Sequence, residues 1–418
     1  MIERAEVTLS AETQVGNLAR LKWPTRPQNQ HTSSHLMLVA ARSAQNGERI
    51  LSELQMRYPY SQHHVATSCQ GMMTDERVSL ASDEVALLSL SDPLSSFGSA
   101  GAALGTPDQT ARLTHELLKT AELRASRAGE HPALVWMSAA PGSEEAVIEA
   151  IKSYFKSPVL ICGGSAADES IAGDWWVADS YNVYPNGLLI SLMYTQAELV
   201  TRFSAGYQIA NRAGVITRGD QRWLLEIDHR PAAQVYNEWC RGALSDYFPD
   251  QNILAASTFQ PLAIPCGQLG LSPYYRVIHP ERICPDGSIT TFSNIKVGDQ
   301  IMLLTGDPES LIGRARRVTH GALLDISSDV SRVRFALVIF CAGCFLAIKD
   351  RVDEIWRELS AELPGVPLLG QFTFGEQGVF PDGKVAHGNL MVSVTLWCDP
   401  APAEPWFEES TKSIEFQR

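Results

Sequence analysis

The stretch that decides the fold lies at residues 335–376 and reads FALVIFCAGCFLAIKDRVDEIWRELSAELPGVPLLGQFTFGE. Its first six residues are apolar and predict a buried strand, and a second apolar run, 366–369, leads into a glycine-containing turn. Between the two runs, apolar residues recur with the helical period: Val352, Ile355, Trp356 and Leu359. The stretch therefore predicts two parallel strands joined by a helix in a right-handed crossover.

Two earlier segments, at residues 36–90 and 133–194, repeat this plan. Each has an apolar strand, a helix, a second apolar strand, a turn of small residues, and then one or two further strands. The helix of the second segment follows Pro141-Gly-Ser143 and carries Glu144 and Glu145 in its first turn, where negative charge complements the helix dipole. We therefore predict an α/β (mixed α+β) fold in which repeated β-α-β-β units form mixed sheets covered by helices, arranged in two modules.

The second unit is predicted to end in a β-hairpin. Strand-like stretches at 175–182 and 187–194 flank the turn Tyr184-Pro-Asn-Gly187. Because an Asn-Gly pair is favoured in tight hairpin turns, we expect these two stretches to pair with each other.

The segment between the second and third units has a different character. Pro231 sits where the first turn of a helix would begin, and an apolar face follows it. Three strand-like stretches come later, at 275–278, 288–292 and 300–304. We place the boundary between the two modules near residues 215–230.

These boundaries predict four parts of the chain. They are a flexible N-terminal arm at 1–34, an N-terminal module at 35–220, a C-terminal module at 221–400 and a tail at 401–418. The arm is polar and mixed, which is why we expect little order there.

Composition narrows the classes of function. The chain has 418 residues, with 34 Lys and Arg against 47 Asp and Glu, a formal net charge of −13. This surplus of negative charge argues against binding nucleic acid or an anionic membrane surface, because both attract basic proteins. The longest apolar stretch, 335–348, is short for a membrane span, and the N-terminus lacks the pattern of a secretory signal. We expect a cytoplasmic protein without membrane insertion, whose eight cysteines are mostly reduced.

The turns and their flanks resemble the FIST family, named for F-box and intracellular signal transduction proteins. The similar segments of the N-terminal half are Gly163-Gly-Ser-Ala166, Trp175-Trp176 and Asn186-Gly187. Those of the C-terminal half are Tyr275-Arg276, Val297-Gly-Asp299, Phe340-Cys-Ala-Gly343, Pro367-Leu-Leu-Gly370, Phe374-Gly-Glu376 and His387. The resemblance covers roughly residues 36–398. Two positions depart from the family pattern: Cys344 stands where Arg is usual, and the turn at 68–71 lacks the expected glycine-rich, acidic form.

The resemblance implies a bacterial sensory protein that binds a small ligand and is not an enzyme. The implied ligand is an amino-acid-like metabolite, or haem in a branch that resembles nitric oxide sensors. The implied partner is a separate signalling protein such as a histidine kinase or a diguanylate cyclase. No kinase, cyclase or DNA-binding module is recognisable in the sequence, so we expect another protein to carry the signal onward.

Glycine turns after buried strands are the first candidates for ligand contact. Such turns leave backbone N–H groups free and let a ligand approach the chain closely, as in many carboxylate and phosphate sites. The alternative is that each glycine only permits a tight turn. The candidate residues in these turns are Gly163, Gly164, Ser165, Gly370 and Gly375.

Four further residues complete the candidate site. Glu376 is suited to hold a ligand ammonium or guanidinium group, and the alternatives are that it caps a backbone group or pairs with Arg276. His387 is suited to hydrogen-bond an organic ligand or to ligate haem iron, and the alternative is a structural histidine. The resemblance adds Arg276 and Cys341 to the ligand-binding set. We predict no catalytic residue, and no metal ligand except His387 if haem is bound.

The sequence Cys341-Ala-Gly-Cys344 offers an alternative function. A C-x-x-C pair after a strand and at a helix start resembles a thioredoxin-type redox pair, because a helix N-terminus lowers a thiol pKa. The alternative is therefore a thiol–disulfide oxidoreductase that uses Cys341 and Cys344. The sequence holds no second C-x-x-C, which argues against a four-cysteine zinc site.

Overall fold

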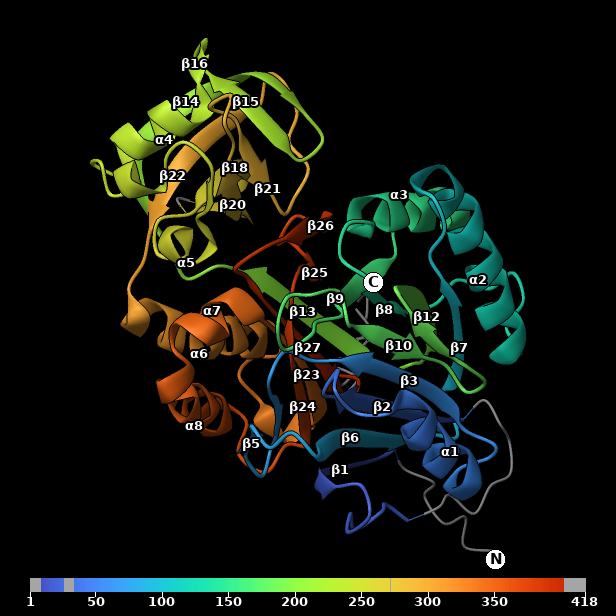
Figure 1. The fold of residues 1–418 in the computed structure, drawn as a ribbon. Helices are drawn as coiled ribbons and strands as arrows, with labels where there is room; N and C mark the ends of the chain where they lie inside the picture. The colour runs from blue at the N-terminus through green and yellow to red at the C-terminus, as the bar shows by residue number, and fades with distance from the viewer. Residues whose placement is uncertain (1–8, 26–33, 271, 402–418) are drawn as a thin grey trace, which may run out of the picture.

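A computed structural model describes residues 9–25, 34–270 and 272–401 of the chain (Figure 1). It confirms the predicted mixed α+β fold and its three β-α-β-β units. In each unit a helix links two parallel strands, and the last strand returns antiparallel beside the first. Most of the predicted arm and tail, at 1–8, 26–33 and 402–418, lies outside the described residues.

The three units use equivalent elements. The first comprises β2 (His35–Ala41), α1 (Gly47–Arg57), β3 (Gln62–Thr67) and β6 (Glu84–Ser91). The second comprises β8 (Leu134–Ala139), α3 (Glu144–Phe155), β9 (Leu160–Ser165) and β12 (Gly187–Tyr194). The third comprises β23 (Val333–Cys341), α7 (Ala342–Ala347), α8 (Val352–Glu362), β24 (Leu368–Thr373) and β27 (Val392–Cys398).

Each unit is the centre of a six-stranded sheet, and all three sheets have the same strand order. An edge strand that precedes the unit comes first, then the unit's last, first and second strands, and then a hairpin. The edge strands are β1 (Ser10–Asn17), β7 (Ser96–Ala103) and β13 (Glu198–Ser204). The hairpins are β4 (Met72–Thr74) with β5 (Val78–Ser79), β10 (Trp176–Ala178) with β11 (Val183–Pro185), and β25 (Glu376–Val379) with β26 (Val385–Gly388).

These hairpins are exchanged between the units in a cycle. The hairpin that follows β3 pairs with β24 of the third unit, and the hairpin that follows β24 pairs with β9 of the second unit. The hairpin that follows β9 pairs in turn with β3 of the first unit. Each sheet is therefore completed by a segment of another unit, and the sheets interlock across the boundary between the two predicted modules.

The inner faces of the three sheets share one apolar core. Leu38 from the first sheet, Trp136 from the second and Leu337 from the third belong to the same buried cluster. Phe335 and Trp397 stack inside it with ring centroids 5.1 Å apart. Burying these side chains together gives the three units a common source of stability.

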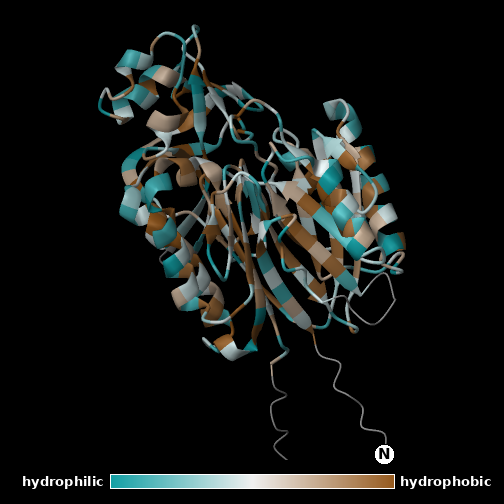
Figure 2. Cartoon of the chain, turned by 60° about the horizontal axis from the view of Figure 1, so that its bottom comes forward, coloured by the Kyte–Doolittle hydropathy of each residue, from teal (hydrophilic) through white to brown (hydrophobic). Residues whose placement is uncertain are grey.

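Helices cover the outer faces of the sheets. Helix α1 packs on the first sheet, α2 (Thr110–Arg124) and α3 pack on the second, and α6 (Pro308–Asp325), α7 and α8 pack on the third. Figure 2 shows hydrophobic residues concentrated on the strands and polar residues on the outer sides of the helices. Among the described helices, none combines the length and the apolar character needed to cross a bilayer.

A separate sheet is inserted between β13 and α6, and we call it the inserted domain (residues 208–305). Its strands are β14 (Gln208–Asp220), β15 (Trp223–Ile227), β16 (Arg230–Pro231), β17 (Gln251–Asn252), β18 (Leu262–Leu269), β19 (Ser272–Ile278), β20 (Pro280–Ile283), β21 (Ile289–Thr291) and β22 (Gln300–Thr305). Helices α4 (Ala232–Trp239) and α5 (Leu254–Ser257) accompany them. The predicted helix after Pro231 and the three predicted strands are confirmed. In Figure 1 this domain stands beside the three interlocked sheets and has its own apolar core.

Part of the predicted flexible arm is a strand. Residues 10–17 form β1, which pairs antiparallel with β6 along its whole length. Thr13 is buried in this strand, and Val15 packs against the shared core. The polar composition of the segment hid this role, because an edge strand needs apolar side chains on one face only.

The predicted hairpin around Asn186-Gly187 is wrong. Strand β10 pairs with β11 through a turn held by Asp179, whose carboxylate accepts hydrogen bonds from the N–H groups of Tyr181 and Asn182. Asn186 has a φ of +49° and marks the point where the chain passes from the first sheet into β12 of the second. The Asn-Gly turn is present, but it connects β11 to β12, which lie in different sheets. Strands β10 and β12 therefore do not pair with each other.

Candidate ligand-binding site

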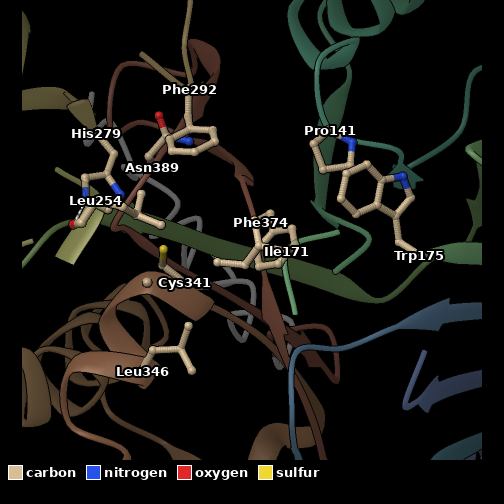
Figure 3. A pocket seen from close by; sticks show the side chains of 11 residues that line it. Pro141, Ile171, Trp175, Leu254, His279, Phe292, Cys341, Leu346, Phe374 and Asn389 are labelled. Atoms are coloured by element: carbon tan, nitrogen blue, oxygen red, sulfur yellow. Dashed lines mark hydrogen bonds between the residues drawn. The ribbon is translucent and has the colours of Figure 1, made fainter. Parts of the chain in front are cut away.

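A cavity lies where the second unit, the third unit and the inserted domain meet (Figure 3). This junction cavity has about 540 Å³ of empty space, counting its open mouth. The second unit supplies Pro141, Ile171 and Trp175 to its wall. The inserted domain supplies Leu254, His279 and Phe292, and the third unit supplies Cys341, Gly343, Leu346, Phe374 and Asn389.

The walls of the junction cavity are mainly apolar and aromatic. Trp175 and Phe374 meet edge to face, with ring centroids 6.0 Å apart. His279 and Phe292 have centroids 6.0 Å apart on the opposite side. Burial lowers the pKa of His279 to about 4, so its ring is neutral at pH 7, and its Nε2 lies 2.9 Å from the carbonyl oxygen of Leu254. Such walls suit the apolar body of a small molecule.

Asn389 is the polar side chain that the cavity leaves unsatisfied. Its Oδ1 accepts a hydrogen bond from the hydroxyl of Ser293, but its Nδ2 has no partner among the described residues. Asn389 is 2% exposed, so bulk water does not solvate this amide freely. A buried amide donor without a partner is unfavourable by about 1–3 kcal/mol, which a ligand acceptor would relieve. Trp175 Nε1 is also unpartnered, but in Figure 3 it points away from the middle of the cavity.

A buried polar cluster adjoins the cavity wall and joins the same three parts of the chain. Nη2 of Arg222, from the inserted domain, donates to Oε2 of Glu144 at 2.8 Å and to Oε2 of Glu145 at 2.9 Å. Oε1 of Glu145 lies 3.1 Å from Nδ1 of His387 and accepts from the N–H of Asn294 at 2.8 Å. The first turn of α3 is thereby tied to the inserted domain and to the third unit.

The electrostatics of this cluster favour ionised carboxylates. Burial alone would raise the pKa of Glu144 and Glu145, but His387 and Arg222 outweigh burial and lower both values. Ligand atoms of Glu144, Glu145 and His387 lie within 4.8 Å of one another, a spacing that a metal ion would need. The guanidinium of Arg222 supplies the positive charge there, so we assign no metal to the cluster.

The predicted site residues fall into separate groups. Ser165, Gly375 and His387 belong to the polar cluster: Ser165 donates to Oε1 of Glu144 at 2.6 Å, and a Cβ on Gly375 would collide with His387. Arg276 lies in an open groove beside the cluster and donates to the carbonyl oxygen of Asn294 at 2.8 Å. Cys341 lines the junction cavity itself.

The other predicted glycines lie inside the sheets. A Cβ on Gly163 would collide with the carbonyl oxygen of Met137, one on Gly164 with Thr373, and one on Gly370 with Met73. These glycines lie in strands β9 and β24 and not in turns, and they allow strands to pack closely within and between the units. None of the three lines the junction cavity.

Glu376 is completely buried and forms no ion pair with Arg276 among the described residues. Its Oε2 accepts from the N–H of Met391 at 3.0 Å, and its Oε1 accepts from the hydroxyl of Thr373 at 3.1 Å. Burial raises the pKa of Glu376 well above its usual value, which favours a neutral carboxyl at pH 7. The backbone-capping alternative therefore fits this residue better than recognition of a cationic ligand.

Several residues of the site carried little or no signal in the sequence. In the sequence, Glu144 and Glu145 are explained by the helix dipole alone, and nothing near Arg222 indicates that its partners lie 78 and 77 residues earlier. Asn389 follows His387 by two positions, so the candidate residue His387 is the feature of the sequence that comes nearest to indicating Asn389.

The surroundings of His387 do not fit a haem ligand. The ring is completely buried, with Nδ1 3.1 Å from Glu145 and Nε2 3.8 Å from Glu144. An iron ligand needs one ring nitrogen free to face an open, apolar slot, whereas both nitrogens here face carboxylates. These surroundings therefore do not suit ligation of haem iron by His387.

The fold and the junction cavity together define a class: mixed α/β proteins built from several units, with a cavity where those units meet. Two family models match the chain and identify the family. The FIST N domain matches residues 35–230, and the FIST C domain matches residues 232–379. The chain belongs to the FIST family, whose domains are associated with sensory signal transduction and small-ligand binding. No curated protein matches the chain in sequence.

Proposed function

We propose that this protein is a sensor whose small ligand binds in the junction cavity. The observation that carries this proposal is the origin of the cavity wall. The second unit, the third unit and the inserted domain each contribute side chains to it. A ligand there would touch all three parts at once, so its binding would depend on how they are placed.

The ligand we propose has an apolar body and one hydrogen-bond acceptor, such as a carboxylate. The aromatic wall of Trp175, Phe292 and Phe374 suits the body, and Nδ2 of Asn389 suits the acceptor. An amino-acid-like metabolite meets both requirements. However, the cavity lining includes no Asp or Glu side chain to balance an ammonium group. A carboxylic acid with the shape of an apolar amino acid therefore fits the cavity better than the amino acid itself.

The signal in this proposal is a population shift. A ligand changes a conformational equilibrium only if it binds one state better than the other. Because the inserted domain contributes side chains to the cavity wall, we propose that the two states differ in the position of this domain. The proposed receiver is a separate signalling protein such as a histidine kinase or a diguanylate cyclase, and the eight free cysteines support a reducing, cytoplasmic location.

Isothermal titration calorimetry with 4-methylpentanoate and L-leucine tests the ligand chemistry. We expect saturable binding of one 4-methylpentanoate per chain and weaker binding of L-leucine. The Asn389→Leu variant should lose most of this affinity, because it removes the amide donor and keeps a side chain of similar size. The control is Asn182→Leu, an exposed position outside the cavity.

Two results would count against the proposal. Equal binding by wild type and Asn389→Leu would show that the acid binds elsewhere. Binding of L-leucine in clear preference to the acid would move the ligand site to the open groove beside Glu145 and Arg276, where both charges are present.

A further inference from the structure

The thiol of Cys341 forms part of the wall of the junction cavity. Strand β23 ends at Cys341, and α7 begins at the next residue, so Cys341 occupies the cap position and Cys344 the first turn of the helix. Figure 3 shows the sulfur of Cys341 pointing into the cavity. Cys344 lies behind it and is completely buried. Cys341 is itself only 3% exposed, so the cavity is the route by which a small molecule would reach its thiol, whereas Cys344 does not line the cavity.

A buried arginine lies beside this pair. The guanidinium of Arg314 sits 4.2 Å over the ring of Phe340, and its Nη1 donates to the carbonyl oxygen of Leu390 at 2.6 Å. Its Nε and Nη2 have no hydrogen-bond partner among the described residues. A fully buried guanidinium requires a nearby negative charge. Burial alone would lower the pKa of Arg314, but its acidic neighbours, Cys344 first among them, raise it, so Cys344 is the group best placed to supply that charge.

The surroundings of the two thiols place the proton on Cys341. The hydroxyl of Tyr207 lies 3.4 Å from Sγ of Cys344. Burial alone would raise the pKa of Cys344, but the hydrogen bond from Cys341 and the charge of Arg314 outweigh burial and lower it to about 6. Burial and the neighbouring Cys344 raise the pKa of Cys341 well above its usual value. These opposite pKa shifts favour a thiol on Cys341, at the cavity wall, and a thiolate on Cys344 behind it.

We propose that Cys341 and Cys344 form a reversible disulfide by exchange with small, uncharged disulfides that enter the junction cavity. The cavity wall selects for such molecules because it is apolar and carries no charged side chain. This inference concerns the thiol pair alone and does not depend on which ligand the protein senses.

The exchange balances without any further reactant. Cys341 passes its proton to Cys344, and the Cys341 thiolate attacks one sulfur of the incoming disulfide, whose S–S bond breaks. The departing thiolate takes the proton from Cys344. The restored Cys344 thiolate then attacks Sγ of Cys341, forms the Cys341–Cys344 bond and expels the second thiolate, which takes a proton from water. The two cysteines lose two electrons, and the small disulfide becomes two thiols.

Intact-protein mass spectrometry after incubation with bis(2-hydroxyethyl) disulfide tests this step. We expect wild type to lose two hydrogen atoms and to regain them with dithiothreitol. The Cys344→Ser variant should instead retain one hydroxyethylthio group on Cys341, because no second thiol can displace it. The Cys341→Ser variant should remain unmodified at Cys344. Oxidised glutathione, which is larger and charged, should react at least tenfold more slowly.

Cys266→Ser is the matched control, because Cys266 is the most exposed cysteine of the chain. Its substitution should leave the mass change intact, and peptide mapping should locate the new bond between residues 341 and 344. A bond involving Cys266, or no mass change in folded wild type, would overturn the proposal.

The role of Arg314 is tested by the pH dependence of the exchange rate. In the Arg314→Lys variant the charge is less well matched to Cys344, so the rate should rise at a higher pH than in wild type. If that variant does not fold, Tyr207→Phe removes one stabilising contact and should shift the profile in the same direction. Unchanged profiles in the folded variants would remove Arg314 and Tyr207 from the mechanism.

Discussion

Gly163 shows how a residue suited to a ligand site by its sequence can have a purely structural role. It has a φ of +148°, and a Cβ there would collide with the backbone of Met137 on the paired strand. We predict that Gly163→Ala lowers the free energy of unfolding by about 3 kcal/mol, because the collision involves backbone that cannot move aside. Chemical denaturation measures this loss.

The control at the residue scale is Gly321, in the middle of α6. A Cβ there meets nothing within 4 Å, and its backbone is helical. Gly321→Ala should therefore stabilise the protein by about 0.5–1 kcal/mol. Equal effects of the two substitutions would show that the close strand approach at Gly163 is not what requires glycine.

At the scale of elements, the exchanged hairpins determine which parts of the chain depend on each other. Met73 in β4 belongs to the first unit by sequence, yet it is completely buried against Gly370 of β24. We predict that Met73→Ala lowers the free energy of unfolding by about 3 kcal/mol through the cavity it leaves. Hydrogen exchange should show the largest loss of protection in β24, which pairs with β4 although it lies about 290 residues further along the chain. Met56→Ala, at a position 64% exposed on α1, is the control.

At the scale of the whole molecule, the cluster around Arg222 fixes the inserted domain against the second unit. Arg222→Met would leave the buried Glu144 and the partly buried Glu145 with His387 as their remaining basic neighbour, and we predict a loss of about 3 kcal/mol at pH 7. The folded-state pKa values of Glu144 and Glu145 lie below their unfolded values. Their pairing therefore stabilises the fold above an unfolded pKa of about 4.3 and is lost as the pH falls through the folded values.

The difference in unfolding free energy between wild type and Arg222→Met should accordingly become smaller as the pH falls below about 4.3. Denaturation of wild type and variant at a series of pH values measures it. Arg282→Met removes an exposed ion pair with Asp250 and should have no measurable effect at any of these values. If the difference in unfolding free energy stays constant with pH, Arg222 stabilises the fold through packing and not through its charge.

The sequence by itself determined the local elements and their repetition. Apolar runs and the helical period of Val352, Ile355 and Leu359 depend on neighbours close in the chain, so the three units and the mixed α+β class could be predicted. The family resemblance rests on the same short segments. It also directed attention to Cys341 and His387, which lie at the junction cavity and its adjoining cluster.

Only the tertiary structure decided how these units combine. The hairpin exchange, the true pairing of β12, and the meeting of Arg222 with Glu144 join segments far apart in the chain, and no periodic pattern encodes such pairs. The sequence does not distinguish a glycine that faces a ligand from one that faces another strand, because both need the space that a Cβ would fill. The location of the site was therefore fixed by which surfaces the shared core brings together.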